Sequence, residues 1–382
     1  MRKHPKRRIP IGVIFSTTGP YSIIGKALYQ GAMLAVDEVN AEQKYKFELD
    51  ALVRDPGGDL SNYRSMCESL IVEYGVSHFV GCYTSSSRKE LIPLLEKHDA
   101  LLCYPSHYEG FECSPNVLYI GAAPNQHVVP LAQYLRKHYG PRIYCVGSNY
   151  IWPWECTRVF REIATGSGGE IVQERYVPVG DTNFNKIIHE IADLKPDVIF
   201  STLIGESCYA FCREYDALRR RMHGGSLHHA PIASCTLSEP ELVEIGEPSS
   251  LGHLTGSVYL ASIDSEANRR FVGAFREKYG VTAVTSADAE ASYLAVHFLA
   301  RALENARSVA FEDVKAAVRG VSFDAPQGSV SVDESNDHCY LTPRIGMSAE
   351  GGNFEVVYTA KCPVRPDPYL VWFDQQSSDV CP

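Results

Sequence analysis

The sequence lacks a long hydrophobic run and an excess of basic residues. No stretch approaches the ~18 consecutive apolar residues that a membrane-spanning helix needs, so membrane insertion is not expected. Lys and Arg number 36 against 46 Asp and Glu, which gives a formal net charge of −10. Because binding to a nucleic-acid backbone requires a basic surface, direct nucleic-acid binding is not expected either. The charge does not exclude a protein partner that itself binds nucleic acid.

Paired metal-binding cysteines are also missing. The twelve cysteines stand singly in apolar runs, with no C-x-x-C pair and no zinc-finger spacing to histidine. We therefore expect no metal site and no cofactor. Scattered buried thiols suit a reducing cytosol better than an oxidising compartment. The apolar segment 9–15 contains Pro10 and Gly12 and is short, so it is predicted to be the first strand and not the core of a secretion signal.

Catalytic motifs are incomplete. The segment from Gly19 to Ala27 resembles a phosphate-binding loop, but five residues separate its glycines where four are required, and Ala27 replaces the magnesium-binding hydroxyl. The segment from Gly205 to Tyr209 begins like a nucleophile elbow, but Tyr209 replaces the second glycine. No nucleophile–base pair is recognisable, so the protein is not expected to be an enzyme.

Strand-like runs alternate with helical periodicity along most of the chain, which predicts βαβ units and parallel sheets. The alternation restarts after Pro124, so we expect two α/β lobes, each a doubly wound parallel sheet. The C-terminal block has too few strands for a sheet of its own and is divided between the lobes. The first lobe would hold residues 8–122 and 258–326, and the second residues 123–257 and 327–382. A hinge crossed three times would join them, with a ligand cleft between.

Hydroxyl and aromatic residues follow the carboxyl ends of two strands predicted in the first lobe. Adjacent parallel strands would bring these side chains together. Ser87 with Glu90 fits a capping box, so the alternative is that the neighbouring serines only cap a helix. The expected cluster comprises Tyr83, Ser85, Tyr104 and Ser106.

The second lobe contributes further candidates after its own strands. Tyr150 stands with two tryptophans in a proline-containing segment, which is a poor place to bury three aromatics, so a cleft wall is favoured over a core position. Thr236 and Glu206 come from two other strand ends, and Glu206 is the one obvious charge nearby. This inventory suits a small neutral solute that forms hydrogen bonds. An amino acid would need a dedicated acidic partner for its ammonium group.

Four blocks of the chain carry a family resemblance: DPGGD, GCYTSSSRK, LLCYPSHYEGFECSPNVLYIGAAPNQ and RPDPY. They resemble the aliphatic-amide and urea receptor group of the type I periplasmic-binding-protein fold, and the likeness covers nearly the whole chain. The resemblance implies two lobes that close on a short amide. It also implies a partner, an RNA-binding antiterminator protein that is held inactive until the amide binds. The positions it implies for amide contact are Tyr83, Ser85, Tyr104, Ser106 and Tyr150, with Thr236 as a weaker assignment.

The acid at Glu206 is closer to the pattern of urea receptors and would favour a solute with an added N–H donor, such as urea, or a cation such as guanidinium. We therefore expect a cytoplasmic, non-catalytic sensor of short amides or urea that controls the antiterminator by opening and closing its lobes. The alternative is a periplasmic receptor of an ABC transporter for urea, amides or branched-chain amino acids. Acidic and apolar faces on the long helices permit a homodimer.

Overall fold

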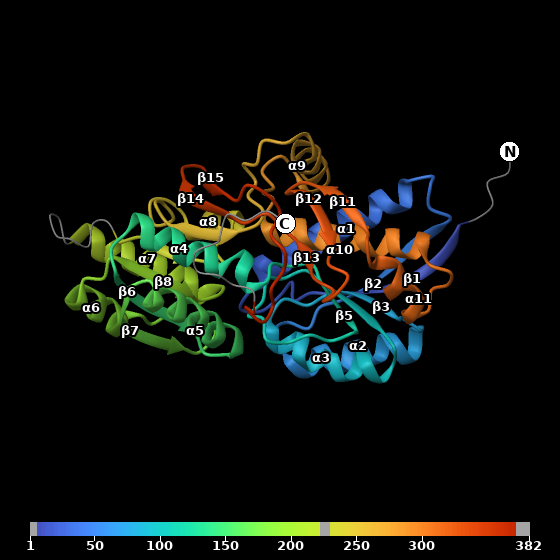
Figure 1. Cartoon of the computed structure of the whole chain (residues 1–382), viewed down its shortest axis with the longest axis horizontal. Helices are drawn as coiled ribbons and strands as arrows, with labels where there is room; N and C mark the ends of the chain where they lie inside the picture. The colour runs from blue at the N-terminus through green and yellow to red at the C-terminus, as the bar shows by residue number, and fades with distance from the viewer. Residues whose placement is uncertain (1–5, 222–229, 372–382) are drawn as a thin grey trace.

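The structure is a computed structural model that describes residues 6–221 and 230–371. Two α/β lobes lie next to each other, as the sequence predicts (Figure 1). The strand expected at residues 9–15 falls within β1 (Arg7–Ile14). Within the described ranges no helix has the length and apolar composition needed to cross a membrane.

The first lobe is built on a sheet of five parallel strands in the order β2-β1-β3-β4-β5. Its central strands β3 and β4 are buried along their whole length, because helices cover both faces. The strands after β1 are β2 (Phe47–Arg54), β3 (His78–Gly81), β4 (Leu101–Tyr104) and β5 (Val117–Tyr119). The connecting helices are α1 (Ser22–Ala41), α2 (Leu60–Tyr74) and α3 (Ser85–Lys97).

Helices from late in the chain pack on the same lobe, where Figure 1 shows α10 and α11 beside the blue N-terminal elements. Helix α10 (Ala287–Asn305) is apolar over most of its surface and is buried between its neighbours. It crosses α1 closely: a Cβ at Gly31 would lie 1.9 Å from the carbonyl oxygen of Ala289. Helices α9 (Glu266–Tyr279) and α11 (Phe311–Val318) join the same hydrophobic core.

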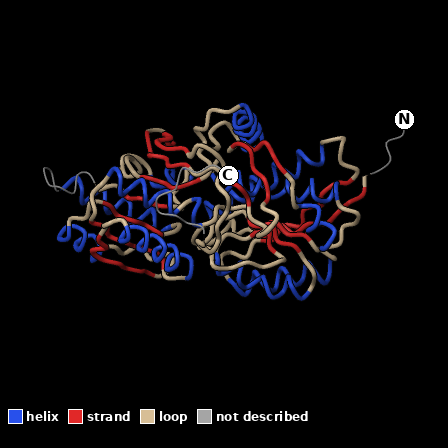
Figure 2. Tube along the Cα trace, in the orientation of Figure 1, coloured by secondary structure: helices blue, strands red, loops and turns tan. Residues whose placement is uncertain are grey.

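The second lobe is built on a seven-stranded sheet in the order β15-β14-β10-β9-β8-β6-β7, with β14 and β15 antiparallel at one edge. Its strands lie between layers of helices (Figure 2). The strands are β6 (Arg142–Ser148), β7 (Glu170–Val177), β8 (Val198–Thr202), β9 (Ile232–Ser234), β10 (Leu254–Ser257), β14 (Arg344–Ala349) and β15 (Asn353–Thr359). The helices are η1 (Pro124–Gln126), α4 (Val128–His138), α5 (Ile151–Gly166), α6 (Asn185–Leu194), α7 (Glu206–Arg221) and α8 (Glu239–Ile245).

A small antiparallel sheet follows α11, formed by β11 (Ser322–Ala325), β12 (Gly328–Val332) and β13 (Cys339–Tyr340). The alternate residues Val330 and Val332 of β12 bury one face of this sheet in the core of the first lobe. The sequence analysis instead placed everything after residue 326 in the second lobe. Because the second sheet resumes only at β14, we propose that the third crossing lies between Tyr340 and Arg344.

Two buried side chains connect the segments that cross between the lobes. The Gln126 Nε2 donates to the carbonyl oxygen of Cys339 at 2.9 Å. The Arg344 guanidinium donates to the carbonyl oxygens of Val258 and Gln327, the latter at 2.8 Å. These bonds link backbone near Gln126, Val258 and Cys339, three segments that lie far apart in the sequence.

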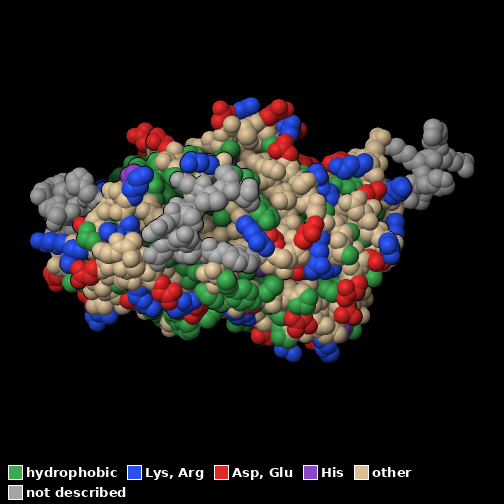
Figure 3. Space-filling model, viewed as in Figure 1, with side chains coloured by type: hydrophobic (Ala, Val, Ile, Leu, Met, Phe, Trp, Pro, Cys, Tyr) green, Lys and Arg blue, Asp and Glu red, His purple; other side chains and the backbone are tan. Residues whose placement is uncertain are grey.

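Acidic and basic side chains are interspersed over the face of the molecule shown in Figure 3. The described residues on that face therefore form no extended basic surface of the kind that nucleic-acid binding requires.

Candidate functional site

The two lobes contact each other across the cleft. The backbone N–H of Glu206 in the second lobe donates to the carbonyl oxygen of Pro20 in the first lobe at 3.3 Å. Gly205 has φ of +58°, and a Cβ there would lie 2.0 Å from the same oxygen, so glycine permits this approach. The structure therefore shows the lobes in a closed arrangement.

A cavity of about 30 Å³ lies between the lobes, at the carboxyl ends of strands from both sheets. The first lobe contributes Pro105 and His107, the second lobe contributes Thr236, and α10 contributes Asp288. A volume of this size holds no more than a water molecule or two. Any solute larger than a few atoms therefore requires the lobes to move apart from this arrangement.

The junction of β3 and α3 positions the first predicted site residues. Helix α3 begins at Ser85 and is capped by Thr84, whose hydroxyl accepts from the Ser87 N–H at 3.1 Å. The capping box predicted from Ser87 and Glu90 is therefore wrong. Backbone N–H groups in the first turn of a helix have no partner within the helix, so this end of α3 can donate to an oxygen in the cleft.

The Ser85 hydroxyl belongs to a buried ionic network that the sequence analysis missed. It donates to the Glu109 carboxylate and accepts from Arg88 Nη1 at 3.3 Å. Arg88 is fully buried, pairs with Glu109 at 3.2 Å and Glu112 at 2.6 Å, and lies 4.7 Å from the ring centre of Tyr104. Coulombic attraction to these carboxylates outweighs burial and holds the pKa of Arg88 well above its usual range. The network fixes Ser85 in place.

Tyr104 and Ser106 also form hydrogen bonds within the first lobe. The Tyr104 hydroxyl donates to the carbonyl oxygen of Tyr83 at 2.6 Å, and the Ser106 hydroxyl donates to that of Cys82 at 3.5 Å. The structure thus places Tyr83, Ser85, Tyr104 and Ser106 at one edge of the first sheet, but the hydroxyls of the last three bond to protein atoms.

Tyr83 lies near acidic groups that the sequence analysis did not nominate. Burial raises the pKa of Tyr83 well above its usual range, and nearby Asp288, Tyr150 and Glu241 add to the rise. Asp288 lies in the first turn of α10 on the first lobe, whereas Tyr150 and Glu241 belong to the second. The predicted site residue Tyr150 is therefore close to Tyr83 across the cleft.

Glu241 is fully buried, and only one of its two carboxylate oxygens has a hydrogen-bond partner. Its Oε2 accepts from the Ser238 N–H and hydroxyl, both at 3.0 Å, whereas Oε1 has no hydrogen-bond partner. The Tyr209 hydroxyl is also buried without a partner within hydrogen-bond distance, and it lies close enough to the Glu241 carboxyl to lower its pKa. Burial, and then the charge of Asp288, raise the pKa of Glu241 to about 8, and burial raises the pKa of Asp288 to about 7. At neutral pH Glu241 is therefore mostly protonated.

Of the last two predicted site residues, Thr236 lies at the cavity and Glu206 lies at the surface. Thr236 lines the cavity, and its hydroxyl donates to the Leu203 carbonyl oxygen at 3.3 Å. Glu206, at the start of α7, has an exposed side chain. The acid buried at the cleft is Glu241. In the sequence, the spacing of Ser238 and Glu241 indicates only a capping box at the start of a helix.

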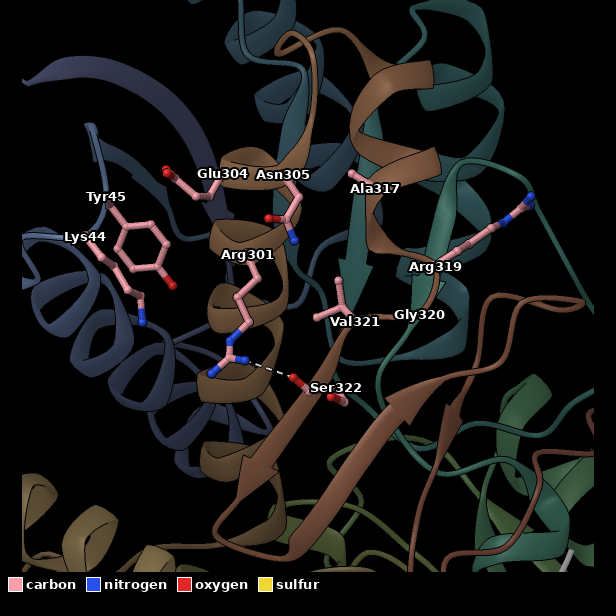
Figure 4. A pocket seen from close by; sticks show the side chains of 10 residues that line it. All are labelled: Lys44, Tyr45, Arg301, Glu304, Asn305, Ala317, Arg319, Gly320, Val321 and Ser322. Carbon is pink, nitrogen blue, oxygen red and sulfur yellow. Dashed lines mark hydrogen bonds between the residues drawn. The ribbon is translucent and has the colours of Figure 1, made fainter.

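A larger cavity of about 430 Å³ lies away from the cleft, on the first lobe. Figure 4 shows Arg301 of α10 pointing toward Ser322, and its Nη1 donates to the Ser322 carbonyl oxygen at 2.9 Å. Lys44 and Glu304 bring opposite charges to the same cavity. Since it is lined by one lobe alone, it is not the cleft site.

Comparisons with known proteins support the same architecture. One relative is "Leu/Ile/Val-binding protein homolog 6" of Brucella abortus, 26% identical over 339 residues that cover 86% of this chain and 85% of that protein. One similar solved structure is an ABC-transporter solute-binding protein of Rhodopseudomonas palustris HaA2, in complex with p-hydroxybenzoic acid. It has a TM-score of 0.84 and 21% identity, and the match covers 96% of this chain and 99% of that one.

A second structure is the branched-chain amino acid transporter substrate-binding protein of Streptococcus pneumoniae in complex with isoleucine. It has a TM-score of 0.80 and 20% identity, and covers 94% of this chain and 100% of that one. The family described as "Periplasmic binding protein domain" matches residues 9–375. Because that match spans nearly the whole chain and the lobes have the type I architecture, this protein belongs to the periplasmic binding protein family and has the type I fold.

Proposed function

We propose that this protein is the solute-binding receptor of an ABC transporter, and that its lobes close on a small solute carrying N–H groups. The observation that carries the proposal is the unpaired Oε1 of Glu241, buried at the cleft near Tyr83. A buried polar atom without a partner costs free energy, which a solute N–H would recover. The transport role is supported by relatives and structural neighbours that are named as solute-binding proteins.

The two ends of the solute would meet different groups. Its nitrogen end would face Glu241 and Asp288, and its oxygen end would face the first turn of α3 at Ser85, where backbone N–H groups can donate. Tyr83 and Tyr150 would flank it from the two lobes. The remaining predicted residues would form the walls: Tyr104, Ser106 and Thr236.

Zwitterionic amino acids are the solutes that the acidic groups favour. In the sequence, Glu206 is the one acid near the predicted site, so the sequence offered an amino acid no further acidic partner for its ammonium group. Glu241 and Asp288 supply buried acidic partners. A benzoate would instead bring a negative charge toward these groups and offer them no N–H.

Short amides and urea are the second candidate class, and the size of the cavity favours them. A cavity of about 30 Å³ accommodates a small solute with less lobe movement than leucine would need.

The relatives favour a periplasmic location over the cytoplasmic sensor that we expected, and they give no support to an antiterminator partner. Ten described cysteines are free, and all but Cys113 are buried, which protects thiols from oxidation. We therefore propose that the receptor works outside the cytoplasm.

A thermal-shift panel tests the proposal. We expect leucine, isoleucine, valine, propionamide or urea to raise the unfolding midpoint by several degrees, because a ligand at ~100 times its dissociation constant adds about 2.7 kcal/mol of stability. We expect 4-hydroxybenzoate to leave the midpoint unchanged. A shift with the benzoate and with none of the N–H solutes would contradict the proposal.

A further inference from the structure

Three metal-ligating side chains meet in the second lobe, beside the cavity between the lobes. His127 immediately precedes α4, Cys156 lies in the second turn of α5, and Cys235 follows β9. Their ligand atoms all lie within 4.8 Å of one another, and all three residues are buried. The fold therefore gathers one nitrogen and two sulfur donors from three separate elements.

The hydrogen bonding of His127 leaves one ring nitrogen free. Its Nε2 lies 3.0 Å from the carbonyl oxygen of Tyr108. A carbonyl oxygen can only accept, so Nε2 carries the hydrogen and Nδ1 has a lone pair. Nδ1 is buried, has no partner within hydrogen-bond distance and lies near the Cys235 thiol. Metal-binding histidines are held in the same way, with one nitrogen fixed by a carbonyl or carboxylate and the other facing the metal.

We propose that Nδ1 of His127 and the sulfur atoms of Cys156 and Cys235 bind a zinc ion. Zinc prefers cysteine and histidine ligands in tetrahedral geometry. Two thiolates balance the charge of Zn²⁺, and the imidazole is neutral, so the complex adds no net charge to a buried position. Monovalent copper on the same donors would leave a net negative charge. The two thiol protons are released to solvent when the metal binds.

The distances require only a small adjustment. Two sulfur atoms on a tetrahedral zinc, each about 2.3 Å from the metal, lie ~3.7 Å apart. The donor atoms lie within 4.8 Å of one another, so side-chain movements of about 1 Å would complete the site.

The fourth coordination position would face the cavity between the lobes, because His127 and Cys235 both line it. Zinc sites with three protein ligands keep such a position for water or another small molecule. The inference concerns residues other than those proposed to hold the solute, so it does not depend on the proposed function.

Zinc titration of the wild-type protein tests the inference without any solute. The full chain is freed of metal and reduced with a non-thiol reductant, then titrated with Zn²⁺ in competition with a chromophoric chelator. We expect one tightly bound zinc per chain. Replacing zinc with Co²⁺ is expected to produce a thiolate-to-cobalt charge-transfer band and the visible bands of tetrahedral cobalt. Absence of tight zinc binding, or cobalt binding without the thiolate band, would overturn the inference.

Variants then identify the ligands. Cys156→Ala, Cys235→Ala and His127→Ala are each expected to weaken zinc binding by more than about 100-fold, since even outer-shell changes cost 10–100-fold. Cys67→Ala removes another buried free thiol, in α2 of the first lobe, and is expected to bind zinc as the wild type does. An equal loss in Cys67→Ala would overturn the assignment. If a ligand variant fails to fold, the wild-type cobalt spectrum still decides whether thiolates bind the metal.

Discussion

Replacing Glu241 with glutamine is expected to weaken binding of an amino acid by about 30-fold or more. Removing one partner of a buried, hydrogen-bonded charge pair costs about 2–5 kcal/mol, and 1.4 kcal/mol corresponds to tenfold in affinity. Glutamine has nearly the same shape as the protonated acid, so the variant should fold. For a short amide, the glutamine oxygen can still accept an N–H, and the loss should stay below about tenfold.

Titration calorimetry of Glu241→Gln measures this effect, with Glu206→Gln as the matched control. Glu206 is an exposed acid of the same lobe, and its replacement should leave the affinity unchanged within about twofold.

Proton release on binding distinguishes amino acids from neutral amides. The pKa of about 8 keeps Glu241 mostly protonated at neutral pH, so an ammonium group that ionises it releases a proton. Equal affinities of Glu241→Gln and wild type for every solute that binds would contradict the assigned role.

Replacing Arg88 with alanine is expected to reduce the free energy of unfolding by about 3–5 kcal/mol, the usual cost of breaking a buried ion pair. The change would leave Glu109 and Glu112, whose side chains are only 2% and 14% exposed, paired with the more exposed Lys89 alone among the described residues. It would also remove the guanidinium that lies between the rings of Tyr104 and Tyr108, 4.7 and 4.8 Å from their centres.

Unfolding in guanidinium chloride measures the loss, and Arg64→Ala provides the control in the same lobe. Arg64 forms an exposed pair with Glu90 at 3.4 Å, with side chains 59% and 35% exposed. Such pairs contribute about 1 kcal/mol or less. If Arg88→Ala were no more destabilising than Arg64→Ala, the buried network would not stabilise the first lobe as proposed.

The lobes and the edge of the first sheet could be predicted because their signals are local. The alternation of strands and helices is a pattern of neighbouring residues, and it predicted the parallel strands of the two large sheets, although not the antiparallel edge of the second. The convergence of Tyr83 and Tyr104 follows from the pairing of adjacent strands β3 and β4. The packing of β12 on the first lobe could not be predicted in this way. Its valines could pack in the core of either lobe, and only the folded chain shows that they pack in the first.

The charged part of the site could not be predicted in the same way. Glu241 stands three residues after Ser238, a pattern that a helix start explains fully. Its burial depends on the opposite lobe, which brings Tyr83 and Asp288 near it. Glu206 fitted the pattern of a site residue, but its side chain is exposed.

The proposed metal site also could not be predicted from the sequence. It consists of His127, Cys156 and Cys235. No metal site was expected, because spacing rules recognise ligands that lie close together in sequence. These three come from different elements of the second lobe, and only the fold brings their donor atoms within 4.8 Å.

The most direct test of the central claim is a crystal structure of this protein with the solute that binds most strongly in the panel. The account predicts that a solute nitrogen lies within hydrogen-bond distance of Glu241 Oε1, and that a solute oxygen lies against Ser85 and the first turn of α3. A solute bound outside the cleft, or one whose nitrogen points away from Glu241, would contradict it.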